Sequence, residues 1–324
     1  MSGAFGWPLT IARVAGNSLL NLIDPPVLIL TYHRVTILKS DPQLLAVIPH
    51  HFRAHMQFLK KNFPVVRFDD DWSNIRKPAV AITFDDGYAD NVLEALPILE
   101  EVRIPATFFV STGAIGTVKE FWWDELERLV LGDWPFHEKF ELDDKTCGRV
   151  WPTRTVADRR KLYGDIQLLM KDVDIMRRES WLMQLRQWAR AGDEGGEENR
   201  LMSVDELQQL GRSRWVTIGA HGITHTPLSS LSVADQRKEI EGSKTQLESW
   251  TGREVKVFAY PYGQRCDYTQ ATVDLCEKAG FIKAAANYFG QTHRWTDPFQ
   301  LPRLVVRSWP MEIFVRQMKR FWIV

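Results

Sequence analysis

The feature that most constrains the fold of this chain is a series of short, continuous apolar runs separated by stretches with helical periodicity. The runs do not alternate apolar with polar side chains, which is typical of strands that are covered on both faces. We expect strands at Val27–Thr31, Val80–Phe84, Ala106–Val110, Val216–Ala220, Val255–Tyr260, Ile282–Ala286 and Leu304–Arg307. Strand–helix alternation predicts a parallel sheet with right-handed crossovers, and therefore an α/β fold in which the sheet closes into a barrel.

The intervals between these strands carry signals for helix starts and ends. Ser203 and Glu206 have the spacing of a capping box at a helix start. Glycines that follow a helical pattern are common just beyond a helix end. We expect helices at Tyr88–Val102, from Ser203 onward, at Val233–Trp250 before Gly252, and at Tyr268–Ala279 before Gly280.

Residues 113–202 break this rhythm with a charged, tryptophan-rich sequence that includes the loop Ala191–Glu198. We interpret them as a mainly helical subdomain inserted between two barrel strands. The 324 residues would then divide into an N-terminal helix over residues 1–25, a barrel over 26–112 and 203–324, and the insertion. Tryptophans at helical spacing more often form a core than a surface for sugar stacking, so we expect a core in the insertion.

Composition excludes several classes of partner. The 41 basic and 41 acidic side chains cancel, so no electrostatic footprint points to nucleic acid or to an anionic membrane. The three cysteines form no CxxC pair and fit structural thiols of a reducing compartment. Residues 8–23 are apolar but interrupted and lack a basic leader, so we expect no signal peptide, no membrane span and a cytoplasmic protein. An alternative role for this stretch is a peripheral membrane contact.

Polar side chains follow several of the predicted strands. His33 follows the first strand, the adjacent Asp85 and Asp86 follow the second, and His221 begins a segment after the fourth that also contains His225. The carboxyl ends of parallel strands meet at one rim, where functional residues of such folds gather. We therefore expect these side chains to lie close together.

The two histidines of the later segment are four residues apart, but the glycine and proline around them favour a loop over a helix. Two imidazoles and one carboxylate form a facial set that holds a divalent metal and leaves positions open for water and substrate. One of the two aspartates could complete this set, and the other could accept a proton from metal-bound water. The alternatives are polar loop histidines and an Asp-Asp-Gly surface turn. The conjunction of the two motifs favours the metal site.

The segments ITFDDGY (82–88), HGITHTPLS (221–229) and FAYPYG (258–263) resemble the signature motifs of the polysaccharide deacetylase family, the metal-dependent carbohydrate N-deacetylases with NodB homology. The resemblance covers roughly residues 27–112 and 215–308. It implies a distorted (β/α)7 barrel with Asp85 as the catalytic base. It also implies a metal bound by Asp86, His221 and His225, usually zinc, with Co2+, Ni2+ or Fe2+ as alternatives.

The chain departs from the family pattern at the proton donor. The late Leu-x-His motif that usually carries the catalytic acid is absent, because that segment contains Leu301-Pro302-Arg303. A branch of the family that acts on exopolysaccharides has its acid histidine early, in a Tyr-His motif that Tyr32-His33 resembles. We therefore assign the general acid to His33. The alternative is a structural histidine at a strand end.

The second departure is a missing arginine. Ala259 follows Phe258 where the third motif of the family often has an arginine. We hypothesise that Arg303 replaces it by orienting Asp85 through a bidentate pair, and the alternative is a surface arginine.

The resemblance implies an enzyme that removes the N-acetyl group from an N-acetylated sugar of a polysaccharide, an oligosaccharide or a lipid-linked glycan precursor, and releases acetate. The metal and the backbone N–H of Tyr262, which follows Pro261 in the third motif, would stabilise the oxyanion. Two alternatives stay open. One is a metal-dependent amidohydrolase acting on a non-sugar amide. The other is an inactive carbohydrate-binding homologue, which the missing arginine keeps open although the two aspartates and two histidines argue against it.

A second histidine cluster, His50, His51 and His55, could suggest another metal site. It lies in the sequence PHHFRAHM, which we interpret as the start of a helix. We expect these histidines to have a structural role.

Overall fold

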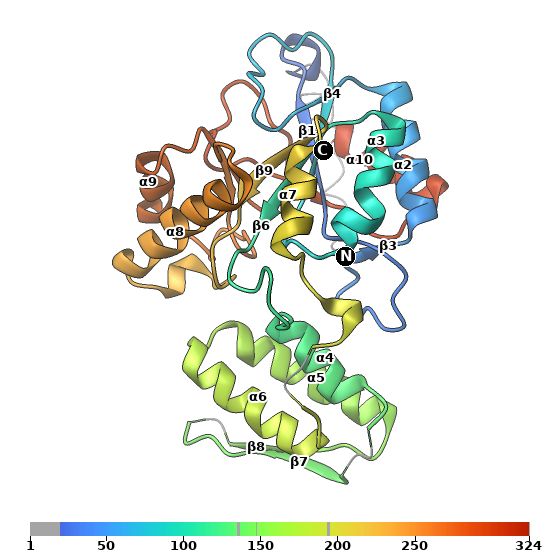
Figure 1. Ribbon diagram of the computed structural model, residues 1–324. Coiled ribbons are helices and arrows are strands. Elements are labelled where there is room, and N and C mark those ends of the chain that lie inside the picture. The colour runs from blue at the N-terminus through green and yellow to red at the C-terminus, as the bar shows by residue number, and fades with distance from the viewer. Residues whose placement is uncertain (1–19, 135–136, 147, 193–194, 324) are drawn as a thin grey trace, which may run out of the picture. The chain divides into compact units, whose positions relative to one another are not determined.

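The computed structural model describes residues 20–134, 137–146, 148–192 and 195–323. The chain forms two compact units, which we call the barrel unit (residues up to 115 and from 202 onward) and the inserted unit (residues 116–201). Both are drawn in Figure 1. Most of the helix expected over residues 1–25, and also Cys147, lie outside the described residues.

The barrel unit is built on one parallel sheet, which has eight strands among the described residues. Seven follow the order β11-β10-β9-β6-β5-β1-β12, and β4 pairs with β5 beside this path. The strands are β1 (Val27–Tyr32), β4 (Val65–Val66), β5 (Ala79–Phe84), β6 (Ala106–Val110), β9 (Val216–Ala220), β10 (Val257–Ala259), β11 (Lys283–Ala285) and β12 (Leu304–Val305). The short strands β2 (Arg34–Val35) and β3 (Ala46–Val47) form a separate parallel pair.

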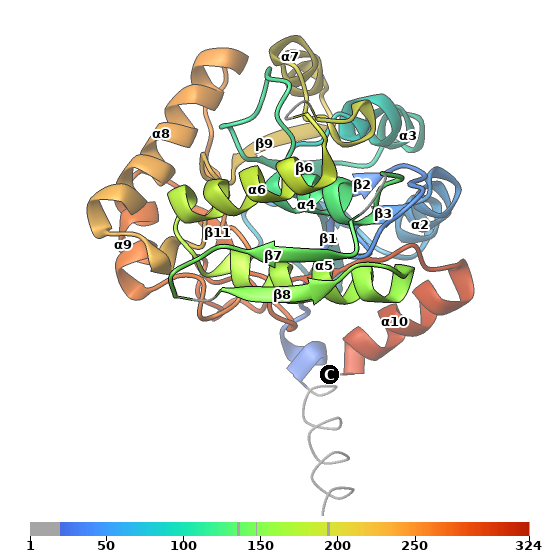
Figure 2. The ribbon, with the colours of Figure 1, turned by 90° about the horizontal axis from the view of Figure 1, so that it is seen from below.

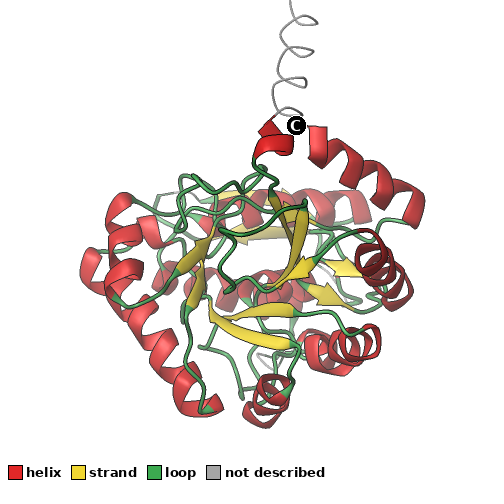
Figure 3. Cartoon of the chain, turned by 90° about the horizontal axis from the view of Figure 1, so that it is seen from above, coloured by secondary structure: helices red, strands yellow, loops and turns green. Residues whose placement is uncertain are grey.

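The sheet curls so that its two ends approach each other. Ala285 of β11 forms a parallel bridge with Leu301, only three residues before β12 begins. The Leu301 N–H donates to the Ala284 carbonyl at 3.1 Å, and the Ala286 N–H donates to the Leu301 carbonyl at 2.9 Å. Figure 3 shows the strands curled inside a layer of helices. The prediction of a distorted (β/α)7 barrel is confirmed.

Helices cover the outside of this sheet, as Figure 2 shows for α2, α3, α7, α8 and α9. Their bounds are α2 (Pro49–Asn62), α3 (Leu96–Val102), α7 (Val204–Arg212), α8 (Val233–Thr251), α9 (Gln270–Lys278) and α10 (Met311–Ile323), with a short 3-10 turn at Leu228–Ser230. The capping box predicted at Ser203 and Glu206 is confirmed, since each side chain accepts from the other residue's backbone N–H. None of the described helices is both long and apolar enough to cross a membrane.

One predicted helix differs from expectation. Residues Asn91–Ala95 form a π-helical turn, and α3 begins only at Leu96, whose N–H donates to the Asn91 carbonyl. Pro97 has no N–H to continue an α-helical ladder back to Leu93, which favours a wider turn before it. π-Helical turns often occur beside functional sites, and this one follows the Asp85-Asp86 segment.

The strand register brings the predicted site residues to one rim. Tyr32 of β1 pairs with Phe84 of β5, so His33 and Asp85 leave adjacent strands at the same level. On the other side of β5, Val110 of β6 pairs with Ala220 of β9, so His221 emerges at the matching end of its strand. All residues of β1 and β5 are buried, which explains their continuous apolar sequences.

The inserted unit combines three helices with a β-hairpin. The helices are α4 (Trp122–Leu131), α5 (Val156–Lys171) and α6 (Ile175–Ala189), with a 3-10 turn at Glu197–Asn199, and the antiparallel hairpin joins β7 (Lys139–Leu142) to β8 (Arg149–Pro152). Sequence patterns indicated helices here but not the hairpin. Its strands have four residues each, which is too short for an alternating pattern to stand out.

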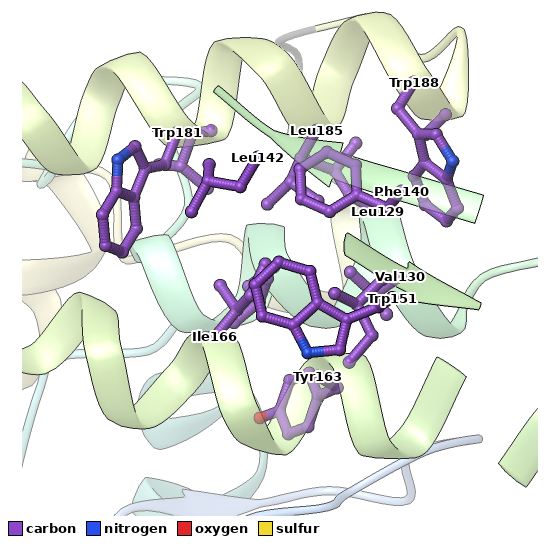
Figure 4. Close-up of a cluster of buried hydrophobic side chains, with 14 of the residues drawn as sticks. Leu129, Val130, Phe140, Leu142, Trp151, Tyr163, Ile166, Trp181, Leu185 and Trp188 are labelled. Atoms are coloured by element: carbon purple, nitrogen blue, oxygen red, sulfur yellow. The ribbon is translucent and has the colours of Figure 1, made fainter. Parts of the chain in front are cut away.

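The tryptophans of the inserted unit form its core, shown in Figure 4. Trp151, Trp181 and Trp188 are all buried. Their indole N–H groups donate to the Asp165 carboxylate, the Asp144 carboxylate and the Lys139 carbonyl at 2.9, 2.8 and 3.0 Å. A buried tryptophan whose N–H is paired stabilises a core without leaving a polar group unsatisfied. The prediction of a tryptophan-rich core is confirmed for these three side chains.

Candidate active site

Two consecutive left-handed residues shape the turn that follows β5. Asp86 has φ +79° and Gly87 has φ +100°. On a regular strand Asp85 and Asp86 would point to opposite faces, but this turn redirects the chain. A side chain at Gly87 would place its Cβ 2.9 Å from Val110, so the turn requires glycine. Both aspartates are buried at this rim.

Asp86 lies next to the two histidines that follow β9. The Asp86 Oδ1 atom is 3.3 Å from His225 Nε2 and 3.7 Å from His221 Nε2. One potential ligand atom from each of the three residues lies within 4.8 Å of the others, and all three residues are buried. Within the described parts of the chain, this is the one group of three or more His, Cys, Asp or Glu side chains so arranged.

The hydrogen bonding of His221 fits a metal ligand. Its Nδ1 is 2.8 Å from the Ala259 carbonyl, and a carbonyl only accepts, so Nδ1 carries the proton. The lone pair of Nε2 is then directed toward Asp86. Burial lowers the pKa of His221 to about 4, which keeps the ring neutral near pH 7. A lone pair facing a carboxylate oxygen is unfavourable without a cation between them, so these residues suit a divalent metal.

Asp85 is held by Arg303, which enters from the segment before β12. Nη1 and Nη2 of Arg303 donate to the two oxygens of Asp85, each at 2.7 Å, and Nε donates to the Ala286 carbonyl at 2.8 Å. Burial alone would raise the pKa of Asp85, but the charge of Arg303, supported by the neighbouring histidines, lowers it to about 2. Arg303 is itself 2% exposed, which excludes the alternative of a surface arginine. The expected bidentate pair is present.

His33 lies on the same rim, at the end of β1. Its ring is partly buried, and among the described residues its buried Nδ1 has no hydrogen-bond partner. Burial lowers the pKa of His33, and the nearby charges of Asp86 and Asp85 oppose that shift. The ring is therefore within electrostatic reach of both aspartates.

Two residues that sequence patterns did not identify fix the backbone of the His33 segment. The Asn91 side-chain amide donates to the His33 carbonyl at 2.9 Å. The Asp90 carboxylate accepts from the Arg34 side chain and from the Val35 N–H, both at 2.9 Å. Asp90 and Asn91 lie only a few residues after the Asp85-Asp86 motif. That short distance in the sequence is the one signal that could have identified them.

Tyr262 completes the rim beside the histidines. Its ring packs edge-on against His225 with centroids 4.8 Å apart, and its φ is +59°. The preceding Pro261 is buried, and its carbonyl accepts a hydrogen bond from the Gly263 N–H at 2.7 Å. His225 is left-handed as well, with φ +53°. Left-handed non-glycine residues cost about 1–3 kcal/mol each, and Asp86, His225 and Tyr262 gather at one site, as is typical of functional centres. The role of the Tyr262 N–H stays a prediction.

The second histidine cluster is arranged differently. His55, in the middle of α2, is buried, with Nε2 2.8 Å from the Trp309 carbonyl and Nδ1 3.3 Å from the Tyr32 hydroxyl. His51 Nδ1 is 3.1 Å from the Ser308 hydroxyl, and His50 is exposed. Both nitrogens of His55 contact protein groups, so this histidine connects α2 to β1 and to the segment before α10.

Comparisons with known proteins point to one family. The polysaccharide deacetylase family model matches residues 73–138 and 186–283, together just over half of the chain. The Bacillus subtilis protein YxkH, whose name assigns it to the polysaccharide deacetylases, is 22% identical over 285 residues, which are 86% of this chain and 70% of that protein. The matched family segments contain both aspartates and both histidines of the rim, whereas His33 and Arg303 lie outside them.

Solved structures show the same fold. The deacetylase PplD from Streptococcus pyogenes superposes with a TM-score of 0.58 at 15% identity, covering 91% of this chain and 98% of that one. BC0361, a polysaccharide deacetylase from Bacillus cereus, superposes with a TM-score of 0.57 at 19% identity, covering 92% of this chain and 69% of that one. With the family match over half of its length, the chain belongs to the polysaccharide deacetylase family.

Proposed function

We propose that this protein is a metal-dependent hydrolase that removes the N-acetyl group from an N-acetylated sugar of a polysaccharide, oligosaccharide or lipid-linked glycan precursor. The observation that carries the proposal is the buried group of Asp86, His221 and His225 beside Asp85. Family membership supports deacetylation of a glycan. The PplD structure is a complex with acetate, which is the product expected here.

Asp86, His221 and His225 would hold the metal, and zinc suits two imidazoles and one carboxylate, as do Co2+, Ni2+ and Fe2+. When bound, such an ion polarises an amide carbonyl and lowers the pKa of a water molecule. The His221 ring is already neutral, so it needs to lose no proton before it binds an ion, and its bond to the Ala259 carbonyl leaves Nε2 as the ligand atom.

Asp85 is the proposed general base. Its low pKa keeps it ionised, which is the form that accepts a proton from the attacking water. The bidentate pair with Arg303 fixes the plane of the carboxylate, and thus the direction from which a proton can be accepted. Because Arg303 makes this contact from another segment, an arginine at position 259 is not needed to hold Asp85.

His33 is the proposed general acid. It leaves the strand next to the one that carries Asp85, and it would transfer a proton to the departing sugar nitrogen. The anchors Asp90 and Asn91 hold its backbone in place. Tyr262 is proposed to contribute its backbone N–H to the oxyanion.

The test combines metal analysis with acetate release from N-acetylated monosaccharides, oligosaccharides and lipid-linked sugars, with an N-acetylated peptide as the non-sugar amide. Asp85→Asn should bind metal as the wild type does and lose about 10²–10⁴-fold in acetate release. Stoichiometric metal without hydrolysis of any of these amides would contradict the proposal. Hydrolysis of the peptide in preference to every sugar would instead support the amidohydrolase alternative.

A further inference from the structure

The segment His221–His225, which we call the histidine loop, is held on one side by the chain that follows β6. The Thr112 N–H donates to the Gly222 carbonyl at 3.1 Å, and the Gly113 N–H donates to the Ile223 carbonyl at 2.8 Å. These bonds satisfy two carbonyl groups of the loop. They leave its N–H groups to be satisfied from elsewhere.

A single carboxylate from α8 satisfies the N–H groups in the middle of the loop. Glu239 Oε2 accepts from the Ile223 N–H at 2.7 Å and from the Thr224 N–H at 3.0 Å. Glu239 Oε1 accepts from the Thr224 hydroxyl at 2.8 Å. Glu239 is 8% exposed, and among the described residues it forms no ion pair with a lysine or arginine. Its acceptor capacity is directed to the histidine loop.

Helix α8 approaches the loop closely around this carboxylate. A Cβ at Gly242, one helical turn after Glu239, would lie 2.8 Å from Ile223 Cδ1. A Cβ at Gly222, which has φ +73°, would lie 3.0 Å from Glu239 Oε2. Glycine at both positions therefore allows the carboxylate to reach the loop backbone, and a larger residue at either position would push the helix and the loop apart.

We propose that Glu239 is a positioning residue for the metal site, because its three hydrogen bonds keep the histidine loop in the conformation that directs both imidazoles toward Asp86. The inference rests on the proposed function only in taking Asp86, His221 and His225 as metal ligands. The left-handed backbone at His225 is costly for a non-glycine residue, and the Glu239 bonds hold the two residues that precede it. Groups that orient metal ligands from outside typically contribute about 10–100-fold to metal affinity.

The test is a Zn2+ titration of the purified full chain against a chromophoric chelator, for the wild type, Glu239→Gln and Glu239→Ala. Glu239→Ala removes all three acceptors, and we expect the Zn2+ dissociation constant to rise about 10–100-fold. Glu239→Gln keeps one acceptor oxygen for the loop N–H groups, and its effect should be smaller. The visible spectrum of bound Co2+ should change in the same order, because it reports ligand geometry.

Two controls lie on the same helix. Glu241 is partly buried and pairs with Arg237, so Glu241→Gln removes a carboxylate that makes no contact with the loop. Ser243 is fully buried and donates to the Ile240 carbonyl of its own helix, so Ser243→Ala perturbs the buried face of α8 without removing a loop contact. Both should bind Zn2+ as the wild type does.

Thermal unfolding of the metal-free variants separates positioning from general stability. If Glu239→Ala unfolds at a lower temperature but binds Zn2+ with unchanged affinity, Glu239 only stabilises the fold and the inference is overturned. If the alanine variant does not fold, the same test is applied to Glu239→Gln. If the wild type itself binds none of Zn2+, Co2+, Ni2+ and Fe2+, the proposed function fails, and the inference fails with it.

Discussion

Two pairs of histidines in this protein have the same spacing and different roles. His221 and His225 lie four residues apart in a loop, and His51 and His55 lie four residues apart on α2. The first pair faces the carboxylate of Asp86, whereas the second pair contacts the Ser308 and Tyr32 hydroxyls and the Trp309 carbonyl. Spacing alone does not identify a metal site. The two pairs differ in the groups that face them, because among the described residues only His221 and His225 lie opposite a carboxylate, that of Asp86 at the end of β5.

The comparison is tested most strongly by removing one histidine from each pair. His225→Ala removes a ligand, so we expect the Zn2+ dissociation constant to rise by more than about 100-fold and acetate release to fall below detection. His51→Ala should leave both unchanged. Metal analysis after dialysis and an acetate assay measure the two effects. Equal metal loss in the two variants would mean that the α2 cluster also binds the ion.

Loss of the proposed proton donor should affect turnover without affecting the metal. His33→Ala is expected to keep stoichiometric metal and to lose about 10²–10⁴-fold in kcat. The reason is that His33 lies on the rim but contributes no atom to the group of three potential ligands. Steady-state kinetics with the best N-acetyl sugar, on samples with confirmed metal content, gives the measurement. Unchanged turnover would transfer the acid role to another residue.

The ion pair between Arg303 and Asp85 should need the guanidinium group of arginine and not only its positive charge. Arg303→Lys keeps a positive charge but cannot donate two parallel bonds, so we expect a loss of roughly 10–100-fold in kcat with metal binding retained. Arg303→Met leaves a buried carboxylate unpaired, and it should lower the free energy of unfolding by about 3–5 kcal/mol. Kinetics and denaturant unfolding measure the two effects. A lysine variant with full activity would show that only the charge is needed.

Much of the fold was predictable because its signals are local. Ala106–Val110 and Val216–Ala220 are short runs with one threonine each and no charged residue, and the structure assigns both strands with the predicted bounds. The predicted strands Val255–Tyr260 and Ile282–Ala286 are too long, because only three residues of each pair in the sheet. The hairpin of the inserted unit was not predicted, because its short strands are fixed by pairs such as Phe140 with Trp151 and not by their own pattern.

The residues of the candidate site also differ in how far local sequence signals could predict them. The aspartates and histidines could be placed on one rim, because each follows a recognisable strand. The groups that orient them could not, because the contacts are tertiary. Glu239 reaches Thr224 from 15 residues away, and Arg303 reaches Asp85 across 218 residues. Arg303 became a candidate only because Ala259 stands where the third motif of the family often has an arginine.

The smallest expected effect concerns His55, one of the two histidines on α2, and the way the free energy of unfolding depends on pH. Burial lowers the pKa of His55 to about 4, below its ordinary value of 6.5. Between these two values the unfolded chain binds a proton at this position and the folded protein does not, so the free energy of unfolding should fall as the pH is lowered from about 6.5 to 4. The upper limit is about 3.5 kcal/mol, since one pKa unit corresponds to about 1.4 kcal/mol.

His55→Gln isolates that contribution, because glutamine can still donate to the Trp309 carbonyl but does not titrate. At pH 7 the variant should be destabilised by about 1–2 kcal/mol, since the packing of the imidazole on Phe314 and one of its hydrogen bonds are weakened. Toward pH 4 the difference from the wild type should shrink, because only the wild type pays the cost of protonating a buried ring. Urea unfolding at several pH values gives both curves. Parallel curves would show that His55 does not titrate on unfolding in this range, and the contrast between a structural and a metal-binding histidine would then rest on geometry alone.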